Sequence, residues 1–213
     1  MTVVFLHAFP LDERMWERQR AHVPGATAPR LYGRGRTMDS WAGSIAAENP
    51  GELTLVGASM GGYCALAFAR REPSRVRGLL LVGARPDADS GERRHGRAAT
   101  IELIRSGGPD GLWRGMRPKL FADPDRWDDG LLFRDPERLV EAVEAIRDRE
   151  DSTELARSLG GRVRFVVGEH DPFVSAAELR DFDVRELPGA GHLVNLERPD
   201  EFQTELEGFL AGV

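Results

Sequence analysis

The chain has 213 residues with 41% hydrophobic residues, which is typical of one folded domain with a sizeable core and excludes a disordered chain. Its formal net charge of −6 argues against nucleic acid and acidic membrane surfaces as partners. Lys119 is the single lysine among many arginines, an excess that we attribute to the source genome rather than to a functional arginine patch.

No segment of the sequence has the pattern of an export signal or a membrane anchor. Residues 1–6 are too short and lack the basic start of a signal peptide. No apolar run approaches the roughly 20 residues that a membrane-spanning helix needs. With Cys64 as the single cysteine, an intramolecular disulfide is impossible. We therefore expect a cytoplasmic protein.

Short apolar runs alternate with helical patterns along most of the chain. The predicted strands are Thr2–Leu6, Thr27–Leu31, Leu53–Val56, Gly78–Val82, Val163–Val167 and Asp183–Leu187. The predicted helices are Asp12–His22, Thr37–Ala47, Met60–Arg71, Ser175–Asp181 and Pro199–Leu210. This alternation predicts an α/β fold, with a doubly wound, mostly parallel sheet of about six strands covered by helices on both faces.

The interval from Arg85 to about Gly160 contains no predicted strand. It is too long for a connecting loop, and helical patterns occupy Arg93–Arg105, Gly111–Phe121 and Pro136–Arg149. We expect residues 85–160 to form a helical cap, inserted into a core made of residues 1–84 and 161–213. Four aromatic residues of this interval either line a substrate pocket or pack the cap onto the core: Trp113, Phe121, Trp127 and Phe133.

Residues 57–61 fit the pattern Gly-x-Ser-x-Gly, with Ser59 at its centre. The pattern lies between a predicted buried strand and a predicted helix, where a sharp turn exposes the serine hydroxyl at the edge of the sheet. Small residues two positions to either side keep the crowded turn free of clashes. Ser59 is therefore a candidate nucleophile.

A serine hydroxyl needs a base within hydrogen-bonding reach and an acid that orients that base. His192 follows the last predicted strand, at the carboxyl edge where active sites of open α/β sheets collect. Asp171 follows another predicted strand and is the candidate acid. Asp87 and Asp89 follow a third strand and are alternative acids, unless they cap the first cap helix.

The end of the first predicted strand supplies a candidate oxyanion hole. Pro10 has no N–H, so the backbone N–H of Phe9 is the best donor in this loop. The second donor is the N–H of Met60, which follows the nucleophile.

With these motifs in this order, the chain resembles the α/β-hydrolase fold superfamily across nearly all its length, and in particular small esterase-like serine hydrolases with a helical cap. The motifs that carry the resemblance are residues 5–10, 31–36, 57–61, 168–171 and 189–192. The resemblance implies that His7 holds the oxyanion loop by hydrogen bonds. Ala8 departs from the family pattern, which usually has glycine there, and the antiparallel strands that usually open the fold are missing.

The predicted reaction is hydrolysis of a small carboxylic ester through an acyl-enzyme on Ser59, with no cofactor and no metal. Thioester, lactone and carbon–carbon bond hydrolysis use the same three side chains and stay open. A non-catalytic receptor that keeps the hydrolase pocket is the alternative of another class. The expected partner is a small-molecule ester, and an exposed sheet edge leaves both a monomer and a homodimer open.

Overall fold

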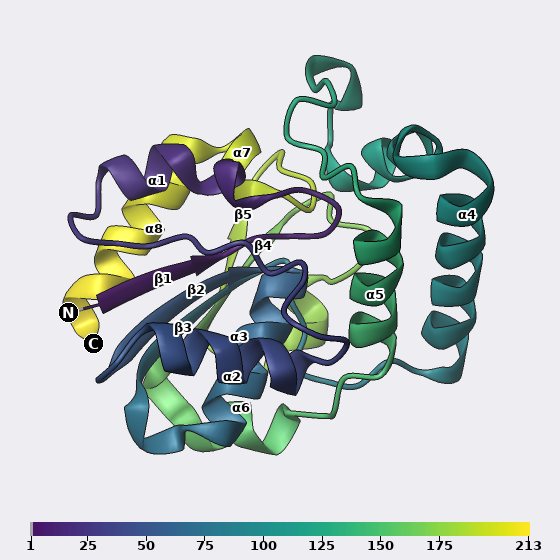
Figure 1. The fold of residues 1–213 in the computed structure, drawn as a ribbon. Helices are drawn as coiled ribbons and strands as arrows, with labels where there is room; N and C mark the ends of the chain where they lie inside the picture. Colours follow the sequence, from purple (N-terminus) through teal and green to yellow (C-terminus); the bar gives the residue numbers. More distant parts are fainter. Residues whose placement is uncertain (1) are drawn as a thin grey trace.

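Helices cover both faces of a five-stranded parallel sheet in the computed structural model, which describes residues 2–213 (Figure 1). Each strand pairs with the next one along the chain, and every pairing is parallel. The strands are β1 (Thr2–Leu6), β2 (Leu53–Ala58), β3 (Val76–Val82), β4 (Val163–Gly168) and β5 (Val184–Leu187). All five were predicted to within a few residues.

The predicted strand Thr27–Leu31 is wrong, because only Thr27 pairs with the sheet, through a single bridge to Val4 on the outer edge of β1. Its N–H donates to Val3, and its carbonyl accepts from Phe5. Pro29, two residues later, has no N–H with which to extend a ladder. The sheet therefore has five strands rather than about six.

The chain thus runs outward from β1 to Thr27 and then returns past β1 to β2. This reversal places α1 on one face of the sheet and α2 and α3 on the other (Figure 1). The carboxyl ends of β1 and β2 consequently form a topological switch point, where open α/β sheets bind their ligands.

Eight α-helices surround the sheet in the described residues 2–213. They are α1 (Glu17–Ala21), α2 (Met38–Glu48), α3 (Met60–Arg71), α4 (Gly91–Leu120), α5 (Pro136–Arg147), α6 (Thr153–Leu159), α7 (Val194–Glu197) and α8 (Pro199–Gly212). Short 3-10 turns complete the pattern, and one of them, Ala176–Leu179, occupies the place of the predicted helix Ser175–Asp181. No helix in this part of the chain combines the length and the apolar character that crossing a bilayer requires.

Successive residues of the strands point into two separate hydrophobic layers. In β3, Leu79 and Leu81 belong to the cluster beneath α2 and α3, whereas Leu80 and Val82 belong to the cluster beneath α1 and α8. Because both faces are buried, the strands are continuously apolar instead of alternating between apolar and polar residues. This explains why short apolar runs located them in the sequence.

Helices α4 and α5 pack against each other at the side of the sheet (Figure 1). The chain bends sharply within α4 at Gly108, whose φ of 60° ends one helical half before Pro109 opens the next. Helix α6 contacts α3 in the layer that covers the sheet. The division of the chain into a core and a cap at residues 85–160 stays a prediction.

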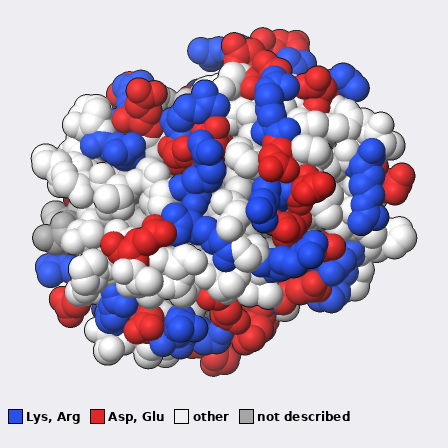
Figure 2. Space-filling model, viewed as in Figure 1, with Lys and Arg blue, Asp and Glu red and all other residues white. Residues whose placement is uncertain are grey.

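Most arginines of the surface are paired with carboxylates. Figure 2 shows basic and acidic side chains interspersed on one face of the molecule. Typical pairs are Arg30 with Glu13, at 2.7 Å, and Arg34 with Glu48, at 2.5 Å. The high arginine content therefore produces no extended basic patch on the face shown.

The glycine after the serine turn is fixed by a close approach of α3 to β1. A Cβ atom on Gly61 would lie 2.1 Å from the Leu6 carbonyl oxygen. We therefore expect Gly61→Ala to lower the free energy of unfolding by at least about 2 kcal/mol, measured by urea denaturation. Gly208→Ala is the matched control, since a Cβ there meets nothing within 4 Å and alanine favours helix α8 by about 0.5–1 kcal/mol. Equal stability of the two variants would contradict the close packing.

Candidate active site

Ser59 occupies a strained turn between β2 and α3. Its φ of 47° and ψ of −109° make it the one non-glycine residue with positive φ among the described residues. A Cβ on Gly57 would meet the Gly61 backbone at 2.5 Å, so the turn has room only for glycine there. A hydrogen bond of 2.7 Å from the Ser59 N–H to the Val82 carbonyl fixes the corner against β3. Such strain persists only where the surrounding structure enforces it, and it is concentrated at functional sites.

The structure joins His192 to Asp171. The Nδ1 atom of His192 lies 2.8 Å from Oδ2 of Asp171, and both side chains are almost fully buried. The other carboxylate oxygen accepts the N–H groups of Phe173, at 2.8 Å, and Val174, at 3.4 Å. With the ring proton on Nδ1 directed at the carboxylate, Nε2 of His192 is the basic nitrogen.

Neighbouring residues hold the imidazole in place. The ring of Phe173 meets it edge-on at 4.7 Å between centroids. On the other side, a Cβ on Gly83 would lie 2.9 Å from the His192 ring, so no other residue fits at that position without displacing the ring. His192 and Ser59 line the same small cavity, together with Phe9. The geometry thus brings all three candidate catalytic side chains to one edge of the sheet.

The alternative acids are engaged elsewhere. Asp87 binds Arg85 and Arg93, each at 2.6 Å. Asp89 binds Arg149 at 2.5 Å and a second arginine nearby, so it does not act as the predicted helix cap. Burial alone would raise the pKa of Asp89, but its arginine partners hold that pKa below the ordinary value. Ser90 caps α4 instead.

The candidate oxyanion donors have free N–H groups. Within the described residues, neither Phe9 nor Met60 donates a backbone hydrogen bond from its N–H. The N–H of Ala8 is directed elsewhere, to the sulfur of Met15 at 3.1 Å. Alanine in the usual glycine position is therefore accommodated without removing either predicted donor.

His7 ties this loop to the segment that follows Thr27. Its Nε2 accepts the N–H of Leu31 at 2.9 Å, and its Nδ1 lies 3.2 Å from the carbonyl of Ala8. Both ring nitrogens of a neutral imidazole are thereby used. The expectation that His7 holds the oxyanion loop by hydrogen bonds is confirmed.

Comparisons with known proteins agree with this geometry. Residues 3–204 match the model of the alpha/beta hydrolase family. The chain belongs to the alpha/beta hydrolase family. This hydrolase superimposes on a thermophilic esterase from Thermogutta terrifontis, solved with malate bound, with a TM-score of 0.88 and 29% identity over 100% of this chain and 90% of that one.

Curated relatives of the hydrolase carry different activities in their names. The 2-succinyl-6-hydroxy-2,4-cyclohexadiene-1-carboxylate synthase of Klebsiella pneumoniae is 26% identical over 92% of this chain and 88% of its own length. The pimeloyl-[acyl-carrier protein] methyl ester esterase of Aromatoleum aromaticum is 32% identical, but the match spans only 39% of this chain and 37% of that protein. Membership of the family therefore does not select one reaction.

Burial makes His7 a source of acid sensitivity in the hydrolase. Burial lowers its pKa from 6.5 to about 4. The unfolded chain therefore binds a proton more readily, so stability falls as the pH drops below 6.5. From pH 7 to pH 5 we expect the His7 contribution to lower the free energy of unfolding by about 2 kcal/mol, measured by urea denaturation.

The control for this prediction is His7→Gln, which keeps a side-chain acceptor for the Leu31 N–H without a group that titrates in this range. Its stability should change less between pH 7 and pH 5 than that of the unaltered protein. Equal losses in the two proteins would show that His7 does not titrate on unfolding.

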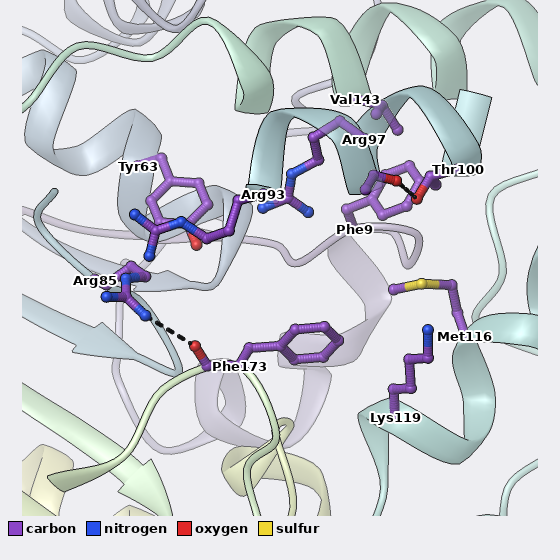
Figure 3. Close-up of a pocket in the computed structure, with 11 residues that line it drawn as sticks. Phe9, Tyr63, Arg85, Arg93, Arg97, Thr100, Met116, Lys119, Val143 and Phe173 are labelled. Carbon is purple, nitrogen blue, oxygen red and sulfur yellow. Dashed lines mark hydrogen bonds between the residues drawn. The ribbon is translucent and has the colours of Figure 1, made fainter. Parts of the chain in front are cut away.

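Two adjoining cavities open beside Ser59. The smaller, of about 40 Å³, is bordered by Ser59 and His192, and the larger has a volume of about 210 Å³ (Figure 3). The residues that border both cavities are Phe9, Tyr63, Arg97, Met116 and Phe173. The larger one is also bordered by Arg85, Arg93, Gly96, Thr100, Lys119 and Val143.

None of the four aromatic residues predicted to line the pocket borders either cavity. Phe121 stacks on Trp127 at 4.6 Å between ring centroids and meets Trp113 edge-on at 6.1 Å. Phe133 stacks on Tyr32 at 4.0 Å. Each of these four rings therefore packs against another aromatic ring.

Sequence reasoning missed the cationic side chains of the larger cavity. Arg93, which begins the first helical pattern predicted in residues 85–160, borders the cavity. Cys64 is buried, and burial raises the pKa of its thiol to about 12. Across residues 2–213 no group of three or more His, Cys, Asp or Glu side chains is arranged to hold a metal ion.

Proposed function

We propose that this alpha/beta hydrolase cleaves small carboxylic esters through an acyl-enzyme on Ser59. The single observation that carries the proposal is the buried His192–Asp171 hydrogen bond of 2.8 Å, beside a cavity that Ser59 also borders. A base oriented by a carboxylate next to a strained serine is the arrangement that activates a hydroxyl for acyl transfer.

The reaction follows from these positions. Nε2 of His192 takes the proton of Ser59 as Oγ attacks the ester carbonyl, and Asp171 stabilises the imidazolium that forms. The free N–H groups of Phe9 and Met60 bind the negative oxygen of the tetrahedral intermediate. His192 then returns the proton to the leaving alcohol. A water molecule, activated by the same histidine, finally releases the acid.

Carboxylic esters are preferred over the other reactions of this machinery because two relatives are named as esterases. One of them, from Thermogutta terrifontis, aligns with the whole of this chain. Thioester, lactone and carbon–carbon bond hydrolysis remain alternatives, as does a receptor without turnover. All of these proteins would have the same fold, so activity must be measured to separate them.

The test combines labelling with turnover. A fluorophosphonate probe should form an adduct that mass spectrometry locates on Ser59, and p-nitrophenyl acetate and butyrate should be hydrolysed over many turnovers. Thioester and lactone substrates run in parallel measure the alternative reactions. Labelling of Ser59 without turnover of any ester would contradict the proposed function and favour the receptor.

A further inference from the structure

The larger cavity is cationic. Among the described residues that border it are Arg85, Arg93, Arg97 and Lys119, and none that borders it is Asp or Glu. On the face that Figure 2 shows, basic and acidic side chains are interspersed, whereas only basic ones border this cavity. An excess of positive charge in a partly enclosed space attracts and orients an anion.

The carboxylates that pair with these arginines do not border the cavity. Asp87 binds Arg85 and Arg93, and Asp89 binds Nε of Arg97 at 2.9 Å. These pairs fix the guanidinium planes. Within residues 2–213, Nη1 of Arg97 forms no hydrogen bond and is therefore available to a ligand.

Lys119 has no such structural role. In the part of the chain that the structure describes, its amine forms neither an ion pair nor a hydrogen bond, although it is the only lysine. The bend of α4 at Gly108 folds the half that carries Lys119 back towards the half that carries Arg97. Figure 3 shows the two charged groups entering the cavity from different walls. Ion pairs with Asp87 and Asp89 account for the arginines, whereas the exposed Lys119 has no such partner among the described residues.

The cationic cavity adjoins the one that Ser59 borders. Phe9, Arg97 and Met116 border both, so a small molecule that occupies the two cavities would lie between Ser59 and Lys119. A volume of about 210 Å³ is below the 300–1,000 Å³ usual for drug-sized ligands, so it suits a short chain.

We propose that the ester cleaved at Ser59 carries a carboxylate, which Arg97 and Lys119 bind in the larger cavity; this rests on the proposed ester hydrolysis. The substrate class is a short ester with one free acid group. That group lies either on the acyl part, as in a half-ester of a dicarboxylic acid, or on the alcohol part, as in an acylated hydroxy acid. A hydrogen bond to a charged partner favours the anion over a neutral isostere.

Two pairs of esters test this substrate class. Each pair consists of an ester with a free carboxylate and its isostere with a neutral amide. Monomethyl glutarate against methyl glutaramate places the charge on the acyl part, and carboxymethyl acetate against carbamoylmethyl acetate places it on the alcohol part. In at least one pair, we expect kcat/KM for the acid to exceed that for the amide by about 10-fold or more. The preference should shrink at high salt.

Lys119→Gln should reduce that preference by about 10-fold, because the amine lacks a structural partner and its loss leaves no buried charge. Arg114→Gln is the matched control: it removes one positive charge from the same half of α4, at an exposed position that borders neither cavity. It should leave the preference unchanged. An equal reduction in both variants would overturn the proposed contact.

The outcomes separate this inference from the proposed function. If the amides are cleaved as well as the acids in a Ser59-dependent reaction, the carboxylate site is wrong and ester hydrolysis stands. If no ester is cleaved, ester hydrolysis fails, and calorimetric binding of glutarate to Ser59→Ala decides about the cavity. Binding that Lys119→Gln weakens about 10-fold supports the site, and absence of binding overturns it.

Discussion

Ser59→Ala is expected to lower kcat for a small ester by about 10⁶-fold, the largest effect in this protein. The substitution removes the oxygen that attacks the carbonyl, and the thiol of Cys64, five positions further on, is buried and protonated. What remains should be the modest acceleration that oxyanion donors and binding provide. Steady-state rates with p-nitrophenyl esters measure the loss.

The control for this result is Ser44→Ala, which removes a serine from α2 at a site that borders neither cavity. It should retain full activity. Both variants should unfold at similar urea concentrations, because Ser59 Oγ forms no hydrogen bond within residues 2–213. More than about 1% residual kcat in Ser59→Ala would exclude the proposed nucleophile.

Asp171→Asn should lower kcat by about 10⁴-fold with little change in the fold. An asparagine oxygen can still accept the N–H of Phe173, but its amide group then faces Nδ1 of His192 as a donor. The imidazole proton is displaced to Nε2, where a base is needed to accept the proton of Ser59. Stopped-flow rates of acylation and of deacylation should both fall, because His192 acts as the base in both steps.

Asp87→Asn is the matched comparison, since Asp87 contacts Arg85 and Arg93 rather than His192. Its kcat for neutral esters should stay within a few-fold of the original value. The reverse pattern, with Asp171→Asn active and Asp87→Asn inactive, would move the acid to the end of β3. The two substitutions remove the same charge, so the difference between them measures position alone.

The positions of the candidate catalytic residues followed from the sequence because topology determines them. Ser59, Asp171 and His192 each follow a predicted strand, and the carboxyl ends of parallel strands meet at one edge. The glycines at 57 and 61 mark the turn in the sequence, because the close contacts of its backbone leave no room for a Cβ at either position. Short sequence patterns were sufficient to locate these residues, because the strand ends and the serine turn are both determined by local backbone geometry.

The pocket could not be predicted in this way. Arg97 and Lys119 lie 22 positions apart on one long helical segment, and only the bend at Gly108 brings them to one cavity. In the sequence, Arg93 and Arg97 have the spacing of an ordinary solvated helix face. Aromatic residues are common in substrate pockets, which favoured those of the same interval as pocket residues. In the structure three of them pack against one another instead. The prediction of a strand at Thr27–Leu31 failed for a different reason, because Pro29 lacks the N–H that would extend the single bridge at Thr27.

The solitary lysine also gives this hydrolase a built-in spectroscopic reporter. Reductive methylation with ¹³C-formaldehyde modifies amines, so apart from the α-amine of the chain only Lys119 acquires a labelled dimethylammonium group. That group keeps its positive charge at the wall of the cavity that Met116 and Phe173 also border. The ¹³C chemical shift of its methyl groups would report ligand binding in the cavity directly, without isotopic labelling of the rest of the protein.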